Sequence, residues 1–399
     1  MIKAPGYVII EKNGAEELMT ERLYRENQYI REFTARVISC ENVKGRFEII
    51  LDRSAFYPEG GGQPGDRGFI GASKVLDTVE REDETIHICD APAQGEVNCA
   101  LDWDYRFLNM QQHTGEHIFS GIMHSLTGYD NVGFHMGESE VTVDFNGPVS
   151  REILEKTELE SNRIIWKNVP VTEIYPGAEE LGNYDYRSKK EISGQVRLIK
   201  IEGADLCACC GTHTAFTGEA GLIKATSMMN YKQGVRITLK IGARALEDYR
   251  EKTENASLIS ASLCAKTGEI AAAVEKLKEK MSAEHLKYIE LKKKYFELMC
   301  EKLTPEFPVL FDDSGSADDA RILADMIAKK FPAGYAFSGN DEDGYKYAAV
   351  SSQTDIRETG KKINAALNGR GGGKPEMIMG SVSASRAQIE EFFRNNPPV

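Results

Sequence analysis

The sequence lacks any long hydrophobic run. None of its apolar stretches approaches the roughly 20 residues that a membrane-spanning helix needs. The first residues, which begin Met1-Ile2-Lys3, contain neither the apolar core nor the small-residue cleavage site of a signal peptide. These absences argue against a membrane or secreted protein, and we expect a cytoplasmic one.

Positive charge is also scarce. The 399 residues hold 49 Lys and Arg against 62 Asp and Glu, which gives a formal net charge of -13. A net negative charge excludes a protein that binds nucleic acid over its whole surface. Any RNA contact must therefore come from a local basic patch. Candidate phosphate contacts recur after Tyr186 and around a C-terminal glycine run: Lys189, Lys190, Arg197, Lys200, Lys224, Lys232, Arg236, Lys240, Arg244, Lys361, Lys362, Arg370 and Lys374.

Cysteine is sparse but clustered. The chain has 8 cysteines, and Cys207, Cys209 and Cys210 are crowded together. In a large cytoplasmic chain such a cluster favours metal binding or catalysis over a disulfide framework. We interpret the other cysteines as buried, inert thiols.

The hydrophobic pattern predicts an α+β protein with several domains. Short alternating segments predict a small β-barrel or sandwich within residues 1–100, which also hold one candidate helix at Glu16–Tyr29. The pattern becomes helical at Asp102, with helical spacings through 106–127 and Gly128 as a stop, and a second helix is expected over 151–168; together they predict an α+β domain at 101–245. This domain holds the candidate zinc ligands described below. A small α/β domain is expected at 304–399.

Residues 246–303 contain no proline and form a predicted helical or coiled-coil spacer. Thr267-Gly268 is expected to separate two helices. A heptad seam follows, interrupted by polar residues only near Glu284 and His285. The spacer and the C-terminal domain together offer a candidate homodimer interface. The seam consists of Ile270, Val274, Leu277, Met281, Tyr288, Leu291, Tyr295 and Leu298.

Two short motifs predict a metal site. In His113-Thr114-Gly115-Glu116-His117 the two imidazoles are four residues apart, so on a helix they share one face. Cys209-Cys210-Gly211-Thr212-His213 adds a thiolate and a third imidazole. Nitrogen and sulfur donors of this kind suit zinc.

Spacing alone leaves several assignments open. Cys207 or Cys210 could replace Cys209 as the sulfur ligand, and His124 and His135 are possible further ligands that we interpret as packing or surface residues. Glu116 is a candidate general base or a partner of a ligand, although its neighbours favour a carboxylate on the helix surface.

A third motif is rich in glycine: Phe56-Tyr57-Pro58-Glu59-Gly60-Gly61-Gly62-Gln63-Pro64-Gly65-Asp66. Glycine lets a backbone approach a ligand closely. The loop lacks the G-K-[ST] of a nucleotide-binding P-loop. With HTGEH, CCGTH and the C-terminal GRGGGKPEMIMGSV, it resembles the editing and C-terminal domains of alanyl-tRNA synthetases and the long AlaX-type trans-editing proteins.

The resemblance covers residues 30–399 and implies a deacylase that hydrolyses Ser-tRNA(Ala), and in some members Gly-tRNA(Ala). It implies zinc on His113, His117, Cys209 and His213, with Gln63 lining the amino-acid pocket and Thr114 holding the substrate hydroxyl. Cys210 departs from the family pattern, in which this position is usually glycine. Synthesis of aminoacyl-tRNA and a need for ATP are not expected, because no class II aminoacylation core is recognisable.

We consider three alternative functions. One is a non-catalytic tRNA-binding module with a structural zinc. A second is editing of threonyl-tRNA, which uses similar histidine and cysteine pairs. A phosphoesterase of the DHH type is disfavoured, because the sequence contains no adjacent His-His pair.

Overall fold

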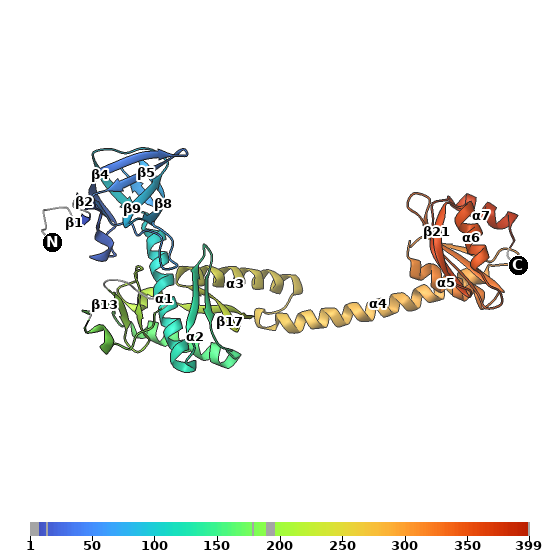
Figure 1. Cartoon of the computed structure of the whole chain (residues 1–399). Helices are drawn as coiled ribbons and strands as arrows, with labels where there is room; N and C mark the ends of the chain where they lie inside the picture. Colours follow the sequence, from blue (N-terminus) through green and yellow to red (C-terminus); the bar gives the residue numbers. More distant parts are fainter. Residues whose placement is uncertain (1–7, 13–14, 178, 189–195, 398–399) are drawn as a thin grey trace. The chain divides into compact units, whose positions relative to one another are not determined.

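The computed structural model describes residues 8–12, 15–177, 179–188 and 196–397 and confirms a mixed α+β protein (Figure 1). The chain forms two compact units, Met1–Leu258 and Ile259–Val399. No helix among the described residues is long and apolar enough to cross a membrane. The four domain boundaries drawn from the sequence stay a prediction.

Six strands of the first unit close into a barrel in the order β10-β4-β5-β9-β8-β7. All neighbouring strands are antiparallel, and β10 completes the ring by pairing with both β4 and β7. Ile49, Leu51, Phe56, Ile70 and Val75 fill the interior. The strands are β4 (Glu32–Val43), β5 (Arg46–Leu51), β7 (Gly68–Ile70), β8 (Ser73–Arg81), β9 (Glu84–Cys89) and β10 (Glu96–Leu101).

A buried histidine in this barrel makes its stability depend on pH. The His87 ring lies 2.8 Å from Ser54 Oγ and 2.9 Å from the Ile49 carbonyl oxygen. Burial lowers the pKa of His87 to about 4. The unfolded chain therefore takes up this proton near pH ~6.5 and the folded chain only near 4, so stability present above the first value is lost on acidification.

We expect His87 to account for about 3 kcal/mol of the unfolding free energy lost between pH 7 and pH 4. Urea unfolding of the parent and of His87→Gln across this range measures the effect. The unfolding free energies of the parent and of His87→Gln, plotted against pH, should converge as the pH falls. Parallel curves would show that His87 protonates equally easily in the folded and unfolded chains.

Helix α1 (Trp103–Thr127) is the central element of the rest of this unit. The Asp102 carboxylate accepts a hydrogen bond from Tyr105 N, and Gly128 ends the helix with a φ of 73°. This is the usual pairing of an acidic N-cap with a left-handed glycine stop. Helix α2 (Arg151–Lys167) packs beside α1. The helices expected from Asp102 to a stop at Gly128 and over 151–168 are confirmed.

Two antiparallel sheets complete the first unit. One has the order β11-β12-β17-β16 and shares an apolar core with α1 and α2 that includes Ile118, Phe119, Ile165 and Ile237. The other has the order β13-β14-β15. The strands are β11 (Asn131–Met136), β12 (Val141–Phe145), β13 (Val171–Ile174), β14 (Leu198–Ile201), β15 (Asp205–Ala208), β16 (Ile223–Tyr231) and β17 (Gly234–Ile241).

The helix expected at Glu16–Tyr29 is wrong. Strand β2 (Ala15–Met19) pairs with β1 (Val8–Lys12), and β3 (Glu21–Arg22) pairs with β6 (Arg53–Ser54). Only Leu23–Arg25 form a short 3-10 helix, η1. Backbone pairing with other segments outweighs a weak amphipathic pattern here, because helix propensity is only a small bias per residue. Two further 3-10 turns lie at Leu181–Asn183 (η2) and Thr217–Ala220 (η3).

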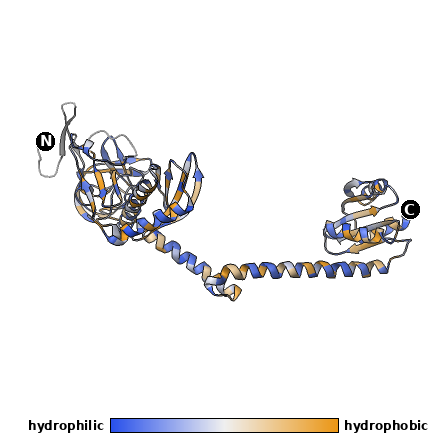
Figure 2. Cartoon of the chain, turned by 90° about the horizontal axis from the view of Figure 1, so that it is seen from below, coloured by the Kyte–Doolittle hydropathy of each residue, from blue (hydrophilic) through white to orange (hydrophobic). Residues whose placement is uncertain are grey.

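Helices α3 (Ala243–Leu263) and α4 (Ile270–Glu301) are separated by the 3-10 turn η4 (Thr267–Glu269), which confirms the predicted break at Thr267-Gly268. Along α4, hydrophobic and hydrophilic residues alternate (Figure 2). Phe296 and Cys300 are buried against α5.

The rest of the second unit is a five-stranded sheet, β18-β19-β20-β22-β21, with three helices. The glycine-rich β21 is an exposed edge strand. The elements are β18 (Val309–Asp312), α5 (Ala317–Ala328), β19 (Ala333–Asn340), β20 (Gly344–Ser351), α6 (Arg357–Ala366), β21 (Gly369–Lys374), β22 (Met377–Val382) and α7 (Arg386–Asn395).

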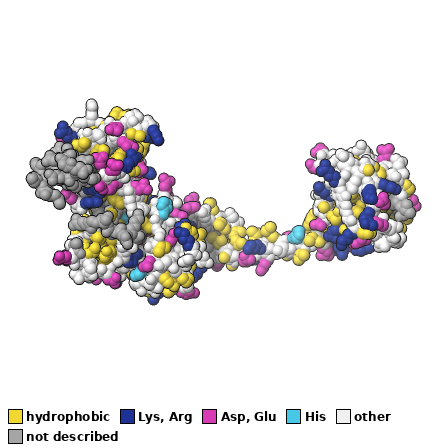
Figure 3. Space-filling model, in the orientation of Figure 1, with side chains coloured by type: hydrophobic (Ala, Val, Ile, Leu, Met, Phe, Trp, Pro, Cys, Tyr) yellow, Lys and Arg dark blue, Asp and Glu magenta, His cyan; other side chains and the backbone are white. Residues whose placement is uncertain are grey.

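The heptad seam of α4 is largely exposed, and in Figure 3 yellow hydrophobic side chains lie along this helix among charged and other side chains. Leu277, Met281, Tyr288, Leu291 and Leu298 are between 45% and 68% exposed. A lysine directly precedes three seam residues that are seven apart, in the pairs Lys280-Met281, Lys287-Tyr288 and Lys294-Tyr295. A homodimer through this face stays a prediction.

Candidate metal centre

Helix α1 presents His113 and His117 on one buried face. The two residues are 1% and 2% exposed, and their ring centroids lie 5.1 Å apart. Buried neighbours such as Ile118 and Phe119 anchor this part of the helix in the core. One turn of helix therefore fixes the distance and relative orientation of the two imidazole rings.

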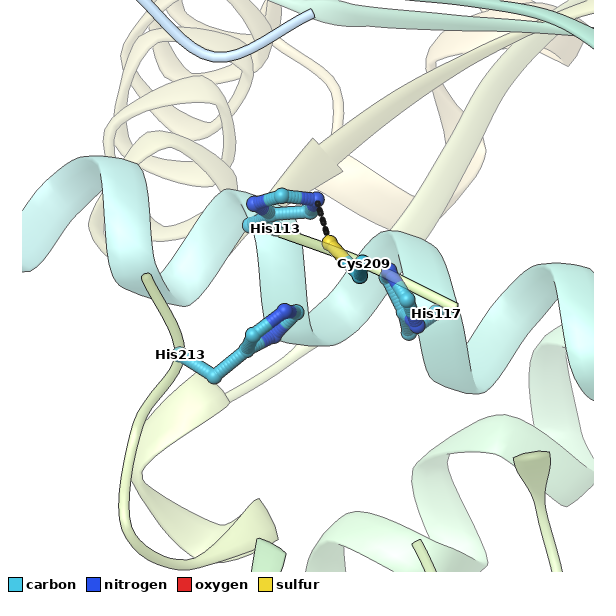
Figure 4. A group of neighbouring side chains, drawn as sticks. All are labelled: His113, His117, Cys209 and His213. Carbon is cyan, nitrogen blue, oxygen red and sulfur yellow. Dashed lines mark hydrogen bonds between the residues drawn. The ribbon is translucent and has the colours of Figure 1, made fainter. Parts of the chain in front are cut away.

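The loop after β15 brings the second motif to the same place. Cys209 Sγ lies 3.4 Å from His113 Nε2, and the His213 ring lies 4.4 Å from the His113 ring and 4.7 Å from the His117 ring (Figure 4). One donor atom from each of His113, His117, Cys209 and His213 lies within 4.8 Å of the others. The structure thus brings all four predicted ligands together.

Each histidine has its Nδ1 held by a different neighbour. His113 Nδ1 is 2.9 Å from Gln63 Oε1, and His117 Nδ1 is 3.0 Å from Asp205 Oδ2. His213 Nδ1 is 3.3 Å from Thr114 Oγ1. A partner on one ring nitrogen fixes the tautomer and directs the other nitrogen to a metal.

The donor set fits zinc. His213 Nε2 is buried and has no hydrogen-bond partner among the described residues, which is unfavourable unless another group meets it. Three imidazole nitrogens and one thiolate are typical zinc ligands. His113, His117, Cys209 and His213 would hold the ion.

The electrostatics of the cluster favour a thiolate. Burial opposes ionisation of Cys209, but His113 and His117 outweigh it and hold the pKa of the thiol well below its ordinary value. Burial alone would lower the pKa of His117, yet Cys209 and Asp205 raise it to about 9. Burial and the nearby His113 lower the pKa of His213 to about 3. A metal cation bound here would replace the imidazole protons as the positive charge that stabilises the Cys209 thiolate.

The glycine motif forms a tight turn beside the cluster. Gly60 and Gln63 pair through two backbone hydrogen bonds of 3.0 Å, and the residues between them, Gly61 and Gly62, have φ values of 59° and 89°. Both values are in the left-handed region that glycine tolerates best. A Cβ at Gly62 would lie 2.5 Å from the Phe134 ring, so the backbone also needs glycine for its close approach.

The three side chains predicted to take part in catalysis are all fully buried. Gln63 Nε2 donates to Thr212 Oγ1 over 2.7 Å, while its Oε1 accepts from Thr212 N and faces His113. Thr114 Oγ1 accepts from Thr214 N over 3.0 Å. Neither side chain reaches the cavity described below, so contact with a substrate hydroxyl stays a prediction.

Glu116 does not lie on the helix surface, and that interpretation of its position was wrong. Its carboxylate is buried and accepts hydrogen bonds of 2.6 Å from Ser120 Oγ and from Asn131 Nδ2. These contacts lie on the side of α1 that faces β11. A catalytic role for Glu116 stays a prediction.

A buried ion pair joins the glycine loop to α1. Arg106 Nε donates to Asp66 Oδ2 over 2.8 Å, and both side chains are at most 1% exposed. Arg106 also donates to the carbonyl oxygens of Ala55 and Gln28, over 2.5 and 2.9 Å. Sequence reasoning missed this pair, although Asp66 ends the glycine motif and Arg106 precedes His113 by two helical turns.

A cavity of about 500 Å³ opens beside the cluster. The turn glycines form one wall, and Cys209 and Cys210 contribute to the other. Arg197 also lines it, and its guanidinium is fixed by Glu173 and by the carbonyl oxygens of Cys209 and Gly211. The lining residues are Gly61, Gly62, His113, His117, Val132, Gly133, Phe134, Ser188, Arg197, Cys207, Ala208, Cys209 and Cys210.

Of the alternative ligands, Cys207 lies beside the cluster, where its sulfur is within 4.8 Å of donor atoms of His117 and Asp205. His124 faces Asp130 and is half exposed, and His135 is exposed. Burial raises the pKa of the Cys207 thiol above its ordinary range, which disfavours it as a ligand. Cys210 is exposed.

Most candidate phosphate contacts of the first unit are already engaged with carboxylates. The pairs are Arg197–Glu173, Lys200–Glu202, Lys224–Glu158, Arg236–Asp144 and Lys240–Asp248. Lys232 lies over the Tyr231 ring, and Arg244 is buried. Lys189 and Lys190 lie outside the described residues. In the second unit Lys361, Lys362, Arg370 and Lys374 are exposed, and Lys361 pairs with Glu358.

Comparisons with known proteins place two parts of the chain in known families. The family model described as "Threonyl and Alanyl tRNA synthetase second additional domain" matches residues 196–255, and that described as "DHHA1 domain" matches residues 304–395.

Three relatives illustrate the extent of the likeness. The chain is 30% identical to "Alanyl-tRNA editing protein AlaX-L" of Pyrococcus horikoshii over 93% of this chain and 96% of that one. It is 26% identical to "Alanyl-tRNA editing protein Aarsd1-A" of Xenopus laevis, over 92% and 95%. "Alanine--tRNA ligase" of Pyrococcus abyssi is 29% identical over 94% of this chain, but over only 43% of the ligase.

Proposed function

This chain belongs to the family of alanyl-tRNA editing proteins, and we propose that it acts in trans as an aminoacyl-tRNA deacylase. Its substrate would be tRNA(Ala) that carries serine or, as a second substrate, glycine. The convergence of three histidines and Cys209 beside a glycine-walled cavity is the observation that carries this proposal.

The bond to be broken is the ester between an amino acid and the terminal ribose of the tRNA. Zinc, when bound, lowers the pKa of a water toward ~7 and polarises a carbonyl oxygen. The residues of this chain would orient the ester: the Gly61-Gly62 turn approaches it with backbone atoms, and Phe134 limits the size of the amino acid. The donor set thus supports hydrolysis in the cavity rather than at the exposed surface.

Selectivity needs polar recognition. A hydrophobic pocket built for alanine rejects serine poorly, whereas a site that hydrogen-bonds the serine hydroxyl rejects alanine strongly, because its polar groups would otherwise lose their partners. We propose Gln63 and Thr114 for this discrimination. Because neither side chain lines the cavity in this structure, a direct contact with the substrate hydroxyl would require one of them to exchange its present hydrogen-bond partner. Both lie within hydrogen-bond distance of a ligand ring, so they would set the position of the rings as well as the selectivity.

The remaining regions supply binding and spacing in this proposal. The barrel carries the glycine motif, α3 and α4 act as a helical spacer, and the C-terminal domain contributes exposed lysines and arginines for phosphate contacts. In the first unit most candidate lysines and arginines already pair with carboxylates. We therefore propose that the second unit supplies most of the positive charge that contacts the tRNA phosphates. The chain would work without ATP in the cytoplasm.

The deciding measurement is a deacylation assay with Ser-, Gly- and Ala-tRNA(Ala), with and without a chelator. We expect hydrolysis of the serine ester well above that of the alanine ester, and loss of hydrolysis when zinc is removed. Restoration by added zinc is the control for damage by the chelator.

Two results would contradict the proposal. Tight binding of tRNA without any deacylation would indicate a binding module with a structural zinc. Hydrolysis of Ser-tRNA(Thr) in preference to Ser-tRNA(Ala) would indicate editing of the threonyl type.

A further inference from the structure

Asp205 is a buried carboxylate to which the proposed mechanism gives no task. It begins β15, and its side chain is 1% exposed. Such a group is stable as an anion only when charged or hydrogen-bonding partners surround it. The structure supplies two partners, and both contact Oδ2.

The first partner is Arg187. Its Nε donates to Asp205 Oδ1 over 2.8 Å and its Nη2 donates to Oδ2 over 2.9 Å, which is the two-pronged geometry of a strong arginine–carboxylate pair. The Arg187 backbone is also fixed to β15. Its N–H donates to Leu206 O over 2.8 Å, and its carbonyl oxygen accepts from Ala208 N over 2.9 Å.

The second partner is the ring of His117. Because Asp205 Oδ2 lies 3.0 Å from His117 Nδ1, the carboxylate accepts the Nδ1 proton and leaves Nε2 as the lone-pair atom. The other two histidines of the cluster have neutral partners, the amide of Gln63 and the hydroxyl of Thr114. His117 alone among these three is backed by a formal charge.

We propose that Asp205, held in place by Arg187, is a positioning residue for the metal ligand His117. It fixes the ring orientation and tautomer and makes Nε2 a stronger donor, as carboxylates behind zinc-bound histidines do. The inference rests on the metal centre of the proposed function. It adds the Arg187–Asp205 pair, which connects the wall of the cavity at Ser188 to the metal ligand His117.

The test is the zinc dissociation constant of Asp205→Asn, measured by competition with a chromophoric chelator on the full chain. The amide keeps the size of the side chain but removes its charge. We expect zinc binding to weaken by roughly 10- to 100-fold. The fold is checked by circular dichroism and by the thermal unfolding midpoint of the zinc-free chain.

Asp144→Asn is the matched control. Asp144 forms the same two-pronged pair with Arg236, over 2.6 and 2.7 Å, but within the described part of the chain it forms no hydrogen bond with a histidine. Its zinc affinity should equal that of the parent. If Asp205→Asn does not fold, Arg187→Gln replaces it, since this variant leaves the carboxylate present but poorly oriented, and its zinc affinity should fall several-fold.

A folded Asp205→Asn, or a folded Arg187→Gln in its place, with the zinc affinity of the parent would overturn the inference and leave the proposed function intact. A parent chain that deacylates Ser-tRNA(Ala) but binds no zinc would instead overturn the metal centre, and this inference with it. Reduced thermal stability with unchanged zinc affinity would assign Asp205 a purely structural role and contradict the proposal.

Discussion

Cys209→Ser is expected to abolish zinc binding and, with it, deacylation of Ser-tRNA(Ala). Cys209 is the one sulfur donor in the cluster, 3.4 Å from His113 Nε2, and the nearby imidazoles hold the pKa of its thiol well below the ordinary value. A serine hydroxyl stays protonated and is a poor ligand for zinc. The loss of zinc affinity should exceed the ~100-fold loss that follows when a residue that only hydrogen-bonds a metal ligand is removed.

Metal content by plasma mass spectrometry, together with the rate of ester hydrolysis, measures this effect. Cys210→Ser is the control for the neighbouring thiol, and its zinc content should remain that of the parent. The reverse pattern, with zinc lost from Cys210→Ser and kept by Cys209→Ser, would show that the other thiol is the ligand.

Arg106→Met is expected to produce the largest loss of stability. The change leaves Asp66 as a buried carboxylate without its cation and removes the donors to Ala55 O and Gln28 O. Breaking a buried ion pair from one side costs about 3–5 kcal/mol. Because Asp66 terminates the glycine motif, the same change should also release the turn that approaches Phe134.

Urea unfolding monitored by circular dichroism measures the loss. Glu48→Gln is the comparison, since Glu48 pairs with Arg81 over 2.8 and 2.9 Å at a site where Arg81 is 54% exposed. Exposed pairs contribute about 0–1 kcal/mol. Equal midpoints for the two variants would mean that Asp66 finds another partner when Arg106 is gone.

The sequence predicted the parts of the site that follow from local periodicity. Residues four apart on a helix share a face, so the convergence of His113 and His117 follows from their spacing alone. The position of Gln63 against His113 does not, because a contact between a barrel loop and a helix leaves no pattern in either segment. The same holds for Asp66 and Arg106.

One missed residue did leave a signal. Side chains two apart on a strand point to the same face, so Asp205 and Cys207 of β15 share a face that leads toward Cys209. The error at Glu16–Tyr29 has the opposite cause: the local pattern was present, but strand pairing with β1 and β6 decided the conformation. Long-range pairing cannot be read from a window of one chain segment.

The site draws on three stretches of chain that are far apart, namely the turn at Gly61-Gly62, helix α1 and the loop that ends at His213. A growing polypeptide therefore has no complete ligand set until His213 has left the ribosome, and no complete cavity until the turn at Gly61-Gly62 has met the helix. Because contacts between distant segments slow folding, hydrolytic competence should arise only after this whole stretch of chain has been made and has folded. Partly synthesised chains would then pose no danger to correctly charged tRNA in the same compartment.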